Sequence, residues 1–189
     1  MCTLLNPQVP HDLELRRPGL RTRIRIRTAM SGLSRLAQHG AASKSDRALE
    51  VTAIALVAVF TIHGIDHLNR GLHFESALIL VLGTVQSLLV GLAAVMVITR
   101  NRRAAAAAVV VGSLNATGFT VQHLLPDWFG PLSDSFIHAP PARHVTAWSW
   151  LFAVLDVVAA IAFAVAGAVE LTRRKRSRAT QFSRRGTAT

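Results

Sequence analysis

The chain has 189 residues, of which 51% are hydrophobic, and yet it carries a formal net charge of +11. A soluble basic protein spreads its charges over amphipathic elements, whereas here the basic and the apolar residues occupy separate stretches, as is typical of membrane proteins. The single cysteine, Cys2, excludes a disulfide framework and a cysteine-based metal motif.

The first 46 residues form a basic N-terminal segment. It mixes Arg, Pro, Gly and Ser with little periodicity, so we expect a largely disordered tail that is drawn to anionic lipid headgroups. Basic tails that flank a membrane span usually determine topology, and we therefore expect no nucleic-acid binding. Met30 is an alternative start to Met1, because the residues after it still supply a sufficient cytoplasmic lead-in.

Four apolar stretches follow, and each is long enough as a helix to cross about 30 Å of hydrocarbon. They cover residues 48–68, 76–98, 104–125 and 147–171. They are too long for strands and show no period-2 alternation, and helices satisfy their own backbone groups in lipid. The sequence therefore predicts an all-α fold: a four-helix transmembrane bundle over residues 47–172, between basic, largely disordered cytoplasmic tails at residues 1–46 and 173–189.

The distribution of lysine and arginine indicates the orientation of the spans. Nine of these residues precede the first span, three lie between the second and third, and seven follow the fourth, which leaves Arg70 and Arg143 for the other side. The positive-inside rule then places both termini and the loop between spans two and three in the cytoplasm. Trp128, Trp148 and Trp150 all fall on the opposite, outer side, where an aromatic belt is expected.

A polar cluster stands at the outer end of the first span. His63, Asp66, His67 and Arg70 recur at offsets of three and four residues, which places them on one helix face. Histidines four residues apart can bind one metal ion, and Asp66 could be a third ligand or could orient a ring. The same spacing is also compatible with capping and with an Asp66–Arg70 ion pair alone.

The other spans carry polar residues at a similar depth. On a rise of about 1.5 Å per residue, His63 and Asp156 lie about 10 Å below the outer ends of their spans, and Gln86 and Asn115 about 15 Å below theirs. An acid at that depth needs a partner, and we expect His63 to be the partner of Asp156. At the outer end of span three, Gln122 and His123 could close the same pocket.

Small residues recur every four positions in the two middle spans. They are Gly83, Ser87 and Gly91 in span two, and Gly112, Ala116 and Thr120 in span three. Such ridges allow helices to approach closely, so we expect them to be contacts within the bundle, with homodimerisation as the alternative. The outer loop over residues 126–145 is rich in proline and aromatic residues. We expect it to lie on the membrane surface, either as an anchor or as a partial cover of the pocket.

Two polar motifs mark the outer ends of spans one and three: HGIDHLNRG at residues 63–71, and QHLLPDW at residues 122–128 with Ser133 and Asp134 shortly after. They resemble small four-span integral membrane proteins of actinobacteria, over about residues 45–172 of this chain. The resemblance implies the fold and a bacterial plasma membrane. No activity and no catalytic residue come with it.

Three functions compete on these residues. The first is a binding protein with an outer-leaflet pocket for a divalent metal, Zn or Cu, with haem or a proton relay less favoured. Its predicted ligands are His63, Asp66, His67, His123 and Asp156, supported by Gln86, Asn115 and Gln122. Haem would need His63 and His123 as a pair on facing helices. The second is an accessory or structural subunit with a membrane-protein partner. An enzyme ranks last, because no Ser, Cys or Lys nucleophile stands beside a base.

Overall fold

The structure is a computed structural model that describes residues 44–72 and 75–186. Four helices in it are long and apolar enough to cross a membrane. They are α2 (Lys44–Arg70), α3 (Ala77–Ile98), α4 (Ala104–Phe119), which continues as the π-helix η2 (Thr120–Leu124), and α5 (Ala147–Gly186). Within these ranges every regular element is helical, so the prediction of an all-α, four-helix bundle is confirmed.

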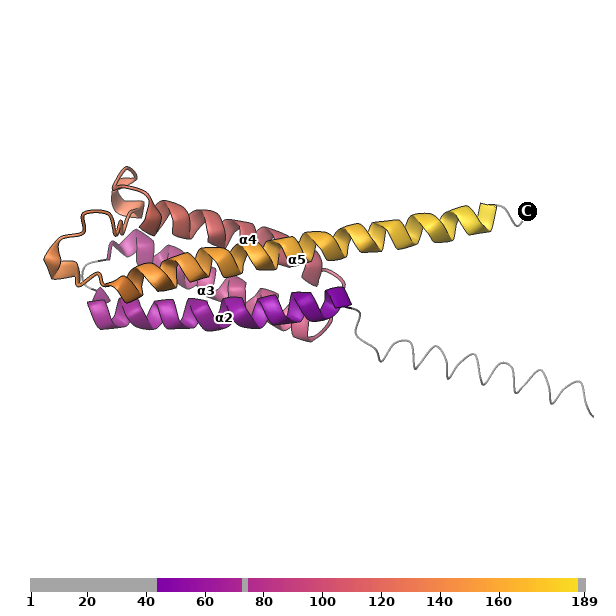
Figure 1. The fold of residues 1–189 in the computed structure, drawn as a ribbon, viewed down its shortest axis with the longest axis horizontal. Coiled ribbons are helices and arrows are strands. Elements are labelled where there is room, and N and C mark those ends of the chain that lie inside the picture. The colour runs from indigo at the N-terminus through magenta and orange to yellow at the C-terminus, as the bar shows by residue number, and fades with distance from the viewer. Residues whose placement is uncertain (1–43, 73–74, 187–189) are drawn as a thin grey trace, which may run out of the picture. The chain divides into compact units, whose positions relative to one another are not determined.

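The helices run up and down in sequence order, and all connections lie at the two ends of the bundle (Figure 1). The C-terminus of α2, the N-terminus of α3, η2 and the start of α5 share one end, which we call the histidine end. Short 3₁₀ turns η3 (Gly130–Leu132) and η4 (Pro141–Arg143) lie in the loop there. The opposite end, where α2 begins and residues 99–103 join α3 to α4, is called the basic end.

Helices α4 and α5 make the closest crossing. A Cβ added to Gly112 would lie 2.6 Å from the carbonyl oxygen of Ala160, and one added to Gly167 would lie 2.6 Å from that of Ala105. Neither position has room for a side chain, so the two backbones touch. The ridge predicted in span three therefore is a contact within the bundle, and α5 carries its own glycine to match.

The ridge predicted in span two behaves differently. Gly83, Ser87 and Gly91 are exposed, and a Cβ at either glycine would meet nothing within 4 Å. Helix α3 is also the least enclosed of the four, since only 17% of its apolar window is buried. The expectation that this ridge packs within the bundle is wrong, because α4 and α5 pair with each other and leave that face of α3 open.

The basic segment after residue 172 also differs from its expectation. It was expected to be largely disordered, but α5 continues through it to Gly186, past the ends of the other helices (Figure 1). Arginine and lysine are good helix formers, and neither glycine nor proline interrupts residues 173–185. The helix therefore propagates beyond the apolar span. The predicted disorder of the N-terminal tail and the alternative start at Met30 lie outside the described residues.

A buried carboxylate connects the helices at the basic end of the bundle. Glu170 on α5, 1% exposed, accepts hydrogen bonds from Ser45 Oγ at 2.8 Å, Arg173 Nε at 3.0 Å and Arg174 Nε at 2.6 Å. Arg174 also donates to the carbonyl oxygen of Arg102 at 2.8 Å. One acid thus links the start of α2, the α3–α4 turn and the end of the span in α5.

We expect Glu170→Gln to lower the free energy of unfolding by about 1–2 kcal/mol, because charge-assisted hydrogen bonds become neutral or are lost. Thermal unfolding of the detergent-solubilised protein, followed by circular dichroism, measures the effect. The matched control is Glu50→Gln on the exposed face of α2, which should leave the unfolding temperature unchanged. Equal stability of the Glu170 variant and the control would contradict the role of this clamp.

Candidate metal centre

Three histidines meet at the histidine end of the bundle. His63 and His67 lie one turn apart on α2, and His123 comes from η2. The helix that carries His123 changes from α to π hydrogen bonding there, as shown by the bond from Leu125 N to Thr120 O at 3.1 Å. A π-turn accommodates an additional residue and changes the direction of the side chains that follow, and such turns are frequent at functional sites.

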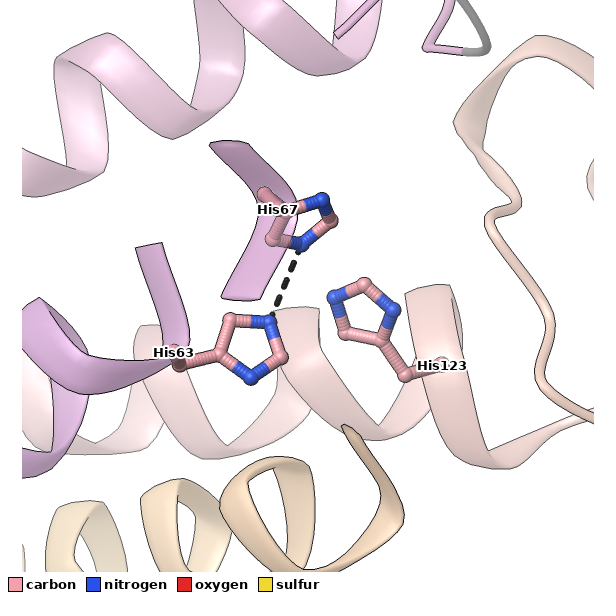
Figure 2. A group of neighbouring side chains, drawn as sticks. All are labelled: His63, His67 and His123. Atoms are coloured by element: carbon pink, nitrogen blue, oxygen red, sulfur yellow. Dashed lines mark hydrogen bonds between the residues drawn. The ribbon is translucent and has the colours of Figure 1, made fainter. Parts of the chain in front are cut away.

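The three rings face one another across a small space (Figure 2). His63 Nε2 and His67 Nε2 are 3.0 Å apart, and the ring centroid of His123 lies 4.9 Å from that of His63 and 5.2 Å from that of His67. One nitrogen from each ring lies within 4.8 Å of the others, a spacing from which a metal ion could bind all three. His63 is 2% exposed and His123 is 0% exposed, so the cluster lies inside the protein.

Hydrogen bonds determine which nitrogens are free to bind a metal. His123 Nδ1 faces the backbone oxygen of Asp134 at 3.1 Å and its carboxylate at 3.5 Å, and His67 Nδ1 faces Glu75 Oε1 at 3.0 Å. Both partners only accept, so we assign the proton to Nδ1 in each ring. The Nε2 lone pair of His67 then accepts from His63 Nε2 at 3.0 Å, whereas that of His123 points into the cluster and has no hydrogen-bond partner among the described residues. An oxygen acceptor behind the ring, as found here for His67 and His123, is the usual way in which proteins orient metal-binding imidazoles, whereas Nδ1 of His63 has no partner among the described residues.

Asp134 takes part in most of the ion pairs that surround the histidines. It accepts from Arg70 Nη2 at 3.0 Å and from Arg143 Nη1 at 2.9 Å, and it is 1% exposed. Burial by itself would raise the pKa of Asp134, but the hydrogen bond with His123 and the charge of Arg70 outweigh it and hold that pKa well below its usual range. Asp134 is therefore ionised at neutral pH and accepts hydrogen bonds from both arginines.

Arg70 occupies the space between the carboxylates. Its Nε donates to Asp66 at 3.1 Å and its guanidinium lies 5.0 Å from the centre of the Phe136 ring. Nη2 also lies 3.0 Å from His67 Nδ1, but it cannot donate there while that nitrogen carries a proton, and its hydrogen bond goes to Asp134. Around the histidines, the acids exceed the arginines by one: Asp66, Glu75 and Asp134 against Arg70 and Arg143. An added cation would therefore meet a favourable formal charge.

Residues 133–136 cover the cluster on the side of the loop. Asp134 N donates to Gln122 O at 3.0 Å, Phe136 N donates to His123 O at 3.0 Å, and Ser135 Oγ donates to Leu125 O at 2.7 Å. All four residues of this segment are buried, and the Phe136 ring lies 4.7 Å from that of His123. We call residues 133–136 the cap segment. It satisfies carbonyls at the end of η2 and closes the site from the loop side, whereas His138 and His144 remain exposed.

The structure brings three of the five predicted ligands together and gives the other two different partners. His63, His67 and His123 come together, whereas Asp66 bonds to Arg70 and accepts from Ser149 Oγ at 3.2 Å. Asp156 accepts from Asn115 Nδ2 at 2.8 Å. The expectation that His63 is its partner is therefore wrong.

Asn115 in turn accepts from Gln86 Nε2 at 2.8 Å, so a buried polar chain links α3, α4 and α5. The second carboxylate oxygen of Asp156 has no partner within the described part of the chain. The polar side chains of α3, α4 and α5 therefore converge as predicted. His63 of α2 does not join them, because it belongs to the histidine cluster. Gln122 contributes its backbone oxygen to the cap segment, and it also lines the cavity described below.

Two important acids were missed or left without a role by sequence reasoning. Glu75 lies directly before the N-cap Ser76 of α3 and reaches His67, and Asp134 was noted only beside the second polar motif, without a role. One signal was available for Glu75, because an acid beside the start of an apolar span, a few residues from a histidine pair, is a natural partner for them. For Asp134 no local pattern existed, since its partners lie 9 to 64 positions away.

A cavity of about 800 Å³ adjoins the histidines, between α2, α3, α4 and η2. All three rings and Glu75 line one part of it, and apolar residues such as Leu80, Val85 and Leu114 line most of the rest. Its volume falls within the range of about 300–1,000 Å³ that is usual for small-molecule sites. A group bound by the three nitrogens would therefore have an open side facing this space.

The same geometry argues against haem between His63 and His123. Axial ligands lie on opposite faces of the macrocycle, but these two rings are in contact and His67 lies against both. A porphyrin could not enter between them without separation of α2 from η2.

No protein family matches this chain, and no curated protein and no solved structure is significantly similar to it.

Proposed function

We propose that this protein is a multi-pass plasma-membrane protein that binds one divalent metal ion, Zn²⁺ or Cu²⁺, through His63, His67 and His123. The observation that carries the proposal is the free, buried Nε2 of His123, directed toward the His63–His67 pair. A buried acceptor without a partner is costly, and a metal ion shared with two neighbouring imidazoles would satisfy it.

The ligand chemistry favours zinc or copper over calcium or magnesium, because imidazole suits the former and the latter prefer oxygen ligands. Asp134 and Glu75 hold the Nδ1 protons of His123 and His67 and so keep the metal-facing nitrogens unprotonated. Three protein ligands and an open fourth position are the arrangement of reactive rather than purely structural zinc sites. In this proposal the fourth position faces the cavity.

The distribution of charge supports an orientation with the histidine end outside. The basic end carries the arginines of the α3–α4 turn and the arginine-rich continuation of α5, which is typical of a cytoplasmic face. The metal would then lie in the outer half of the bilayer, and the basic extension of α5 would attract anionic headgroups.

An accessory subunit is the rival function, and the hydrogen-bonded chain of Gln86, Asn115 and Asp156 favours it. That chain connects three helices and resembles the polar contacts that fix helix packing in membranes. If the histidines had the same purpose, their replacement would disturb folding and release no bound species. A metal measurement therefore separates the two functions.

The test is metal analysis by mass spectrometry of the detergent-purified protein and of His63→Ala, His67→Ala and His123→Ala. We expect about one Zn²⁺ or Cu²⁺ per chain in the native protein and at least a tenfold lower affinity in each variant, because loss of one of three ligands removes much of the binding energy. The matched controls are His138→Ala and His144→Ala, which replace exposed histidines of the same loop region.

A metal-free native protein that takes up neither added Zn²⁺ nor Cu²⁺ would contradict the proposal. Equal metal content in the cluster variants and in the two controls would also overturn it. In both cases the accessory-subunit function would be favoured.

A further inference from the structure

The three histidines are covered on the side of the cap segment and border the cavity on the other side. On the loop side, the cap segment and the Arg70–Asp134–Arg143 ion pairs cover His123. On the other side the cavity reaches the rings between α2, α3 and α4. A molecule that reaches the fourth position without displacing the cap segment therefore comes through this cavity, whose walls are mostly apolar.

The cavity is open along the three helices that border it. Gly64 on α2, Gly83 on α3 and Gly118 on α4 all line it and are exposed, and a Cβ on any of them would meet nothing within 4 Å. Exposed apolar side chains surround these glycines, including Leu68 and Val85. In a bilayer, such a surface faces lipid chains rather than water.

Polar and apolar groups are separated along the cavity. The three histidines and Glu75 gather at the histidine end, whereas leucine, valine and glycine line most of the walls. The hydroxyls of Thr61, Thr84 and Ser87 also line the walls, but each donates to a backbone oxygen of its own helix. Deeper in the cavity, Gln86 and Asn115 already bond to each other, and Asn115 bonds to Asp156. The free polar groups at the head of an apolar space match a molecule with a polar head and a hydrocarbon chain.

Glu75 indicates which chemical group the polar head of the bound molecule carries. Its Oε1 accepts from His67, whereas Oε2 is buried and has no partner among the residues that the structure describes. This oxygen can only accept, so it requires a donor hydrogen. A hydroxyl group offers both functions that are needed, since its oxygen can bind a metal and its hydrogen can bond to Glu75.

We propose that the cavity binds a long-chain amphiphile with a hydroxyl head, an alcohol or a phenol, whose chain enters from the bilayer between α2, α3 and α4. The head lies between Glu75 and the histidines. The contact of its oxygen with a metal ion rests on the function proposed above, whereas the binding of its hydrocarbon chain in the cavity does not. The site is then a place where a lipid-soluble molecule meets a polar centre inside the membrane.

The experiment uses the full chain in vesicles of phosphatidylethanolamine and phosphatidylglycerol, labelled with tetradecanol that carries a photoreactive diazirine at its chain end. The labelled residues are identified by mass spectrometry. Unlabelled tetradecanol, a decyl-substituted hydroquinone and tetradecane compete with the probe, so that alcohol, phenol and headless chain are compared. The variants Gly83→Leu and Gly118→Leu fill the cavity, and Ala162→Leu adds the same side chain on an exposed face of α5. The metal content of every sample is measured in parallel.

We expect labelling of cavity residues that falls about tenfold in Gly83→Leu and Gly118→Leu, with unchanged metal content and normal labelling in Ala162→Leu. Tetradecanol or the hydroquinone should compete, and the stronger competitor identifies the natural head, whereas tetradecane should not compete. Equal labelling in all variants, or equal competition by tetradecane, overturns the inference while a bound metal leaves the proposed function intact. A native protein that lacks metal but shows the expected labelling overturns the proposed function, and it supports the binding of the hydrocarbon chain in the cavity.

Discussion

Replacing Asp134 by asparagine is expected to lower the free energy of unfolding by about 3–5 kcal/mol, the usual cost of breaking a buried ion pair on one side. Arg70 and Arg143 both donate to this carboxylate, and Arg70 is itself buried. The neutral amide leaves two positive charges under-compensated, and it weakens the hold on His123. Metal affinity should therefore also fall, by about 10–100-fold, as is usual when a partner of a metal-binding histidine is lost.

The measurement is thermal unfolding in detergent, with Asp127→Asn on the exposed part of the same loop as control. Because the pKa of Asp134 is depressed in the folded state, its stabilisation is present above the ordinary carboxyl pKa of 3.8 and is lost as the pH falls through the folded value. The difference between native protein and variant should be constant above about pH 5 and shrink in strong acid. A stability difference that is absent at neutral pH would contradict the role of Asp134 in these ion pairs.

Alanine at Gly112 or Gly167 is expected to destabilise the bundle by about 3 kcal/mol, the upper part of the range for overpacking. The new methyl group would lie 2.6 Å from a backbone oxygen of the partner helix, and a backbone cannot move aside as a flexible side chain can. Helices α4 and α5 would have to separate. Unfolding by increasing amounts of a denaturing detergent, followed by circular dichroism, measures the loss.

Gly91→Ala is the matched control for these two substitutions, because a Cβ there meets nothing within 4 Å. Alanine is the better helix former by about 0.5–1 kcal/mol, so the control should be neutral or slightly stabilising. A Gly112 variant as stable as the Gly91 variant would mean that the close crossing of α4 and α5 does not contribute to the stability of the bundle.

Part of the candidate site could be predicted from local spacing. His63, Asp66, His67 and Arg70 belong to one helix, and the offsets of three and four residues directly place them on one face. The predicted order of acid and base gives the observed Asp66–Arg70 ion pair at 3.1 Å. Interactions within one helix follow from its period, so no tertiary information is needed for them.

Other parts of the site depend on contacts that no local pattern encodes. His123 reaches the cluster because the end of α4 winds as a π-helix, and the cap segment supplies partners for the freed carbonyls. Asp156 pairs with Asn115 rather than with His63 because the rotation of α5 follows the close glycine contacts with α4. Hydropathy states how deep a residue lies but not which way it faces.

The sequence by itself determined the class of the protein: four helical spans, a charge asymmetry between their ends, and a histidine pair at the less basic end. These features depend on hydrophobicity and helical period, which are properties of consecutive residues. Only the tertiary structure decided that a third histidine, Glu75 and Asp134 join the histidine pair and that an open cavity adjoins this cluster. Those features arise from the packing of helices through small residues and from a folded loop, where residues 9 to 64 positions apart become neighbours.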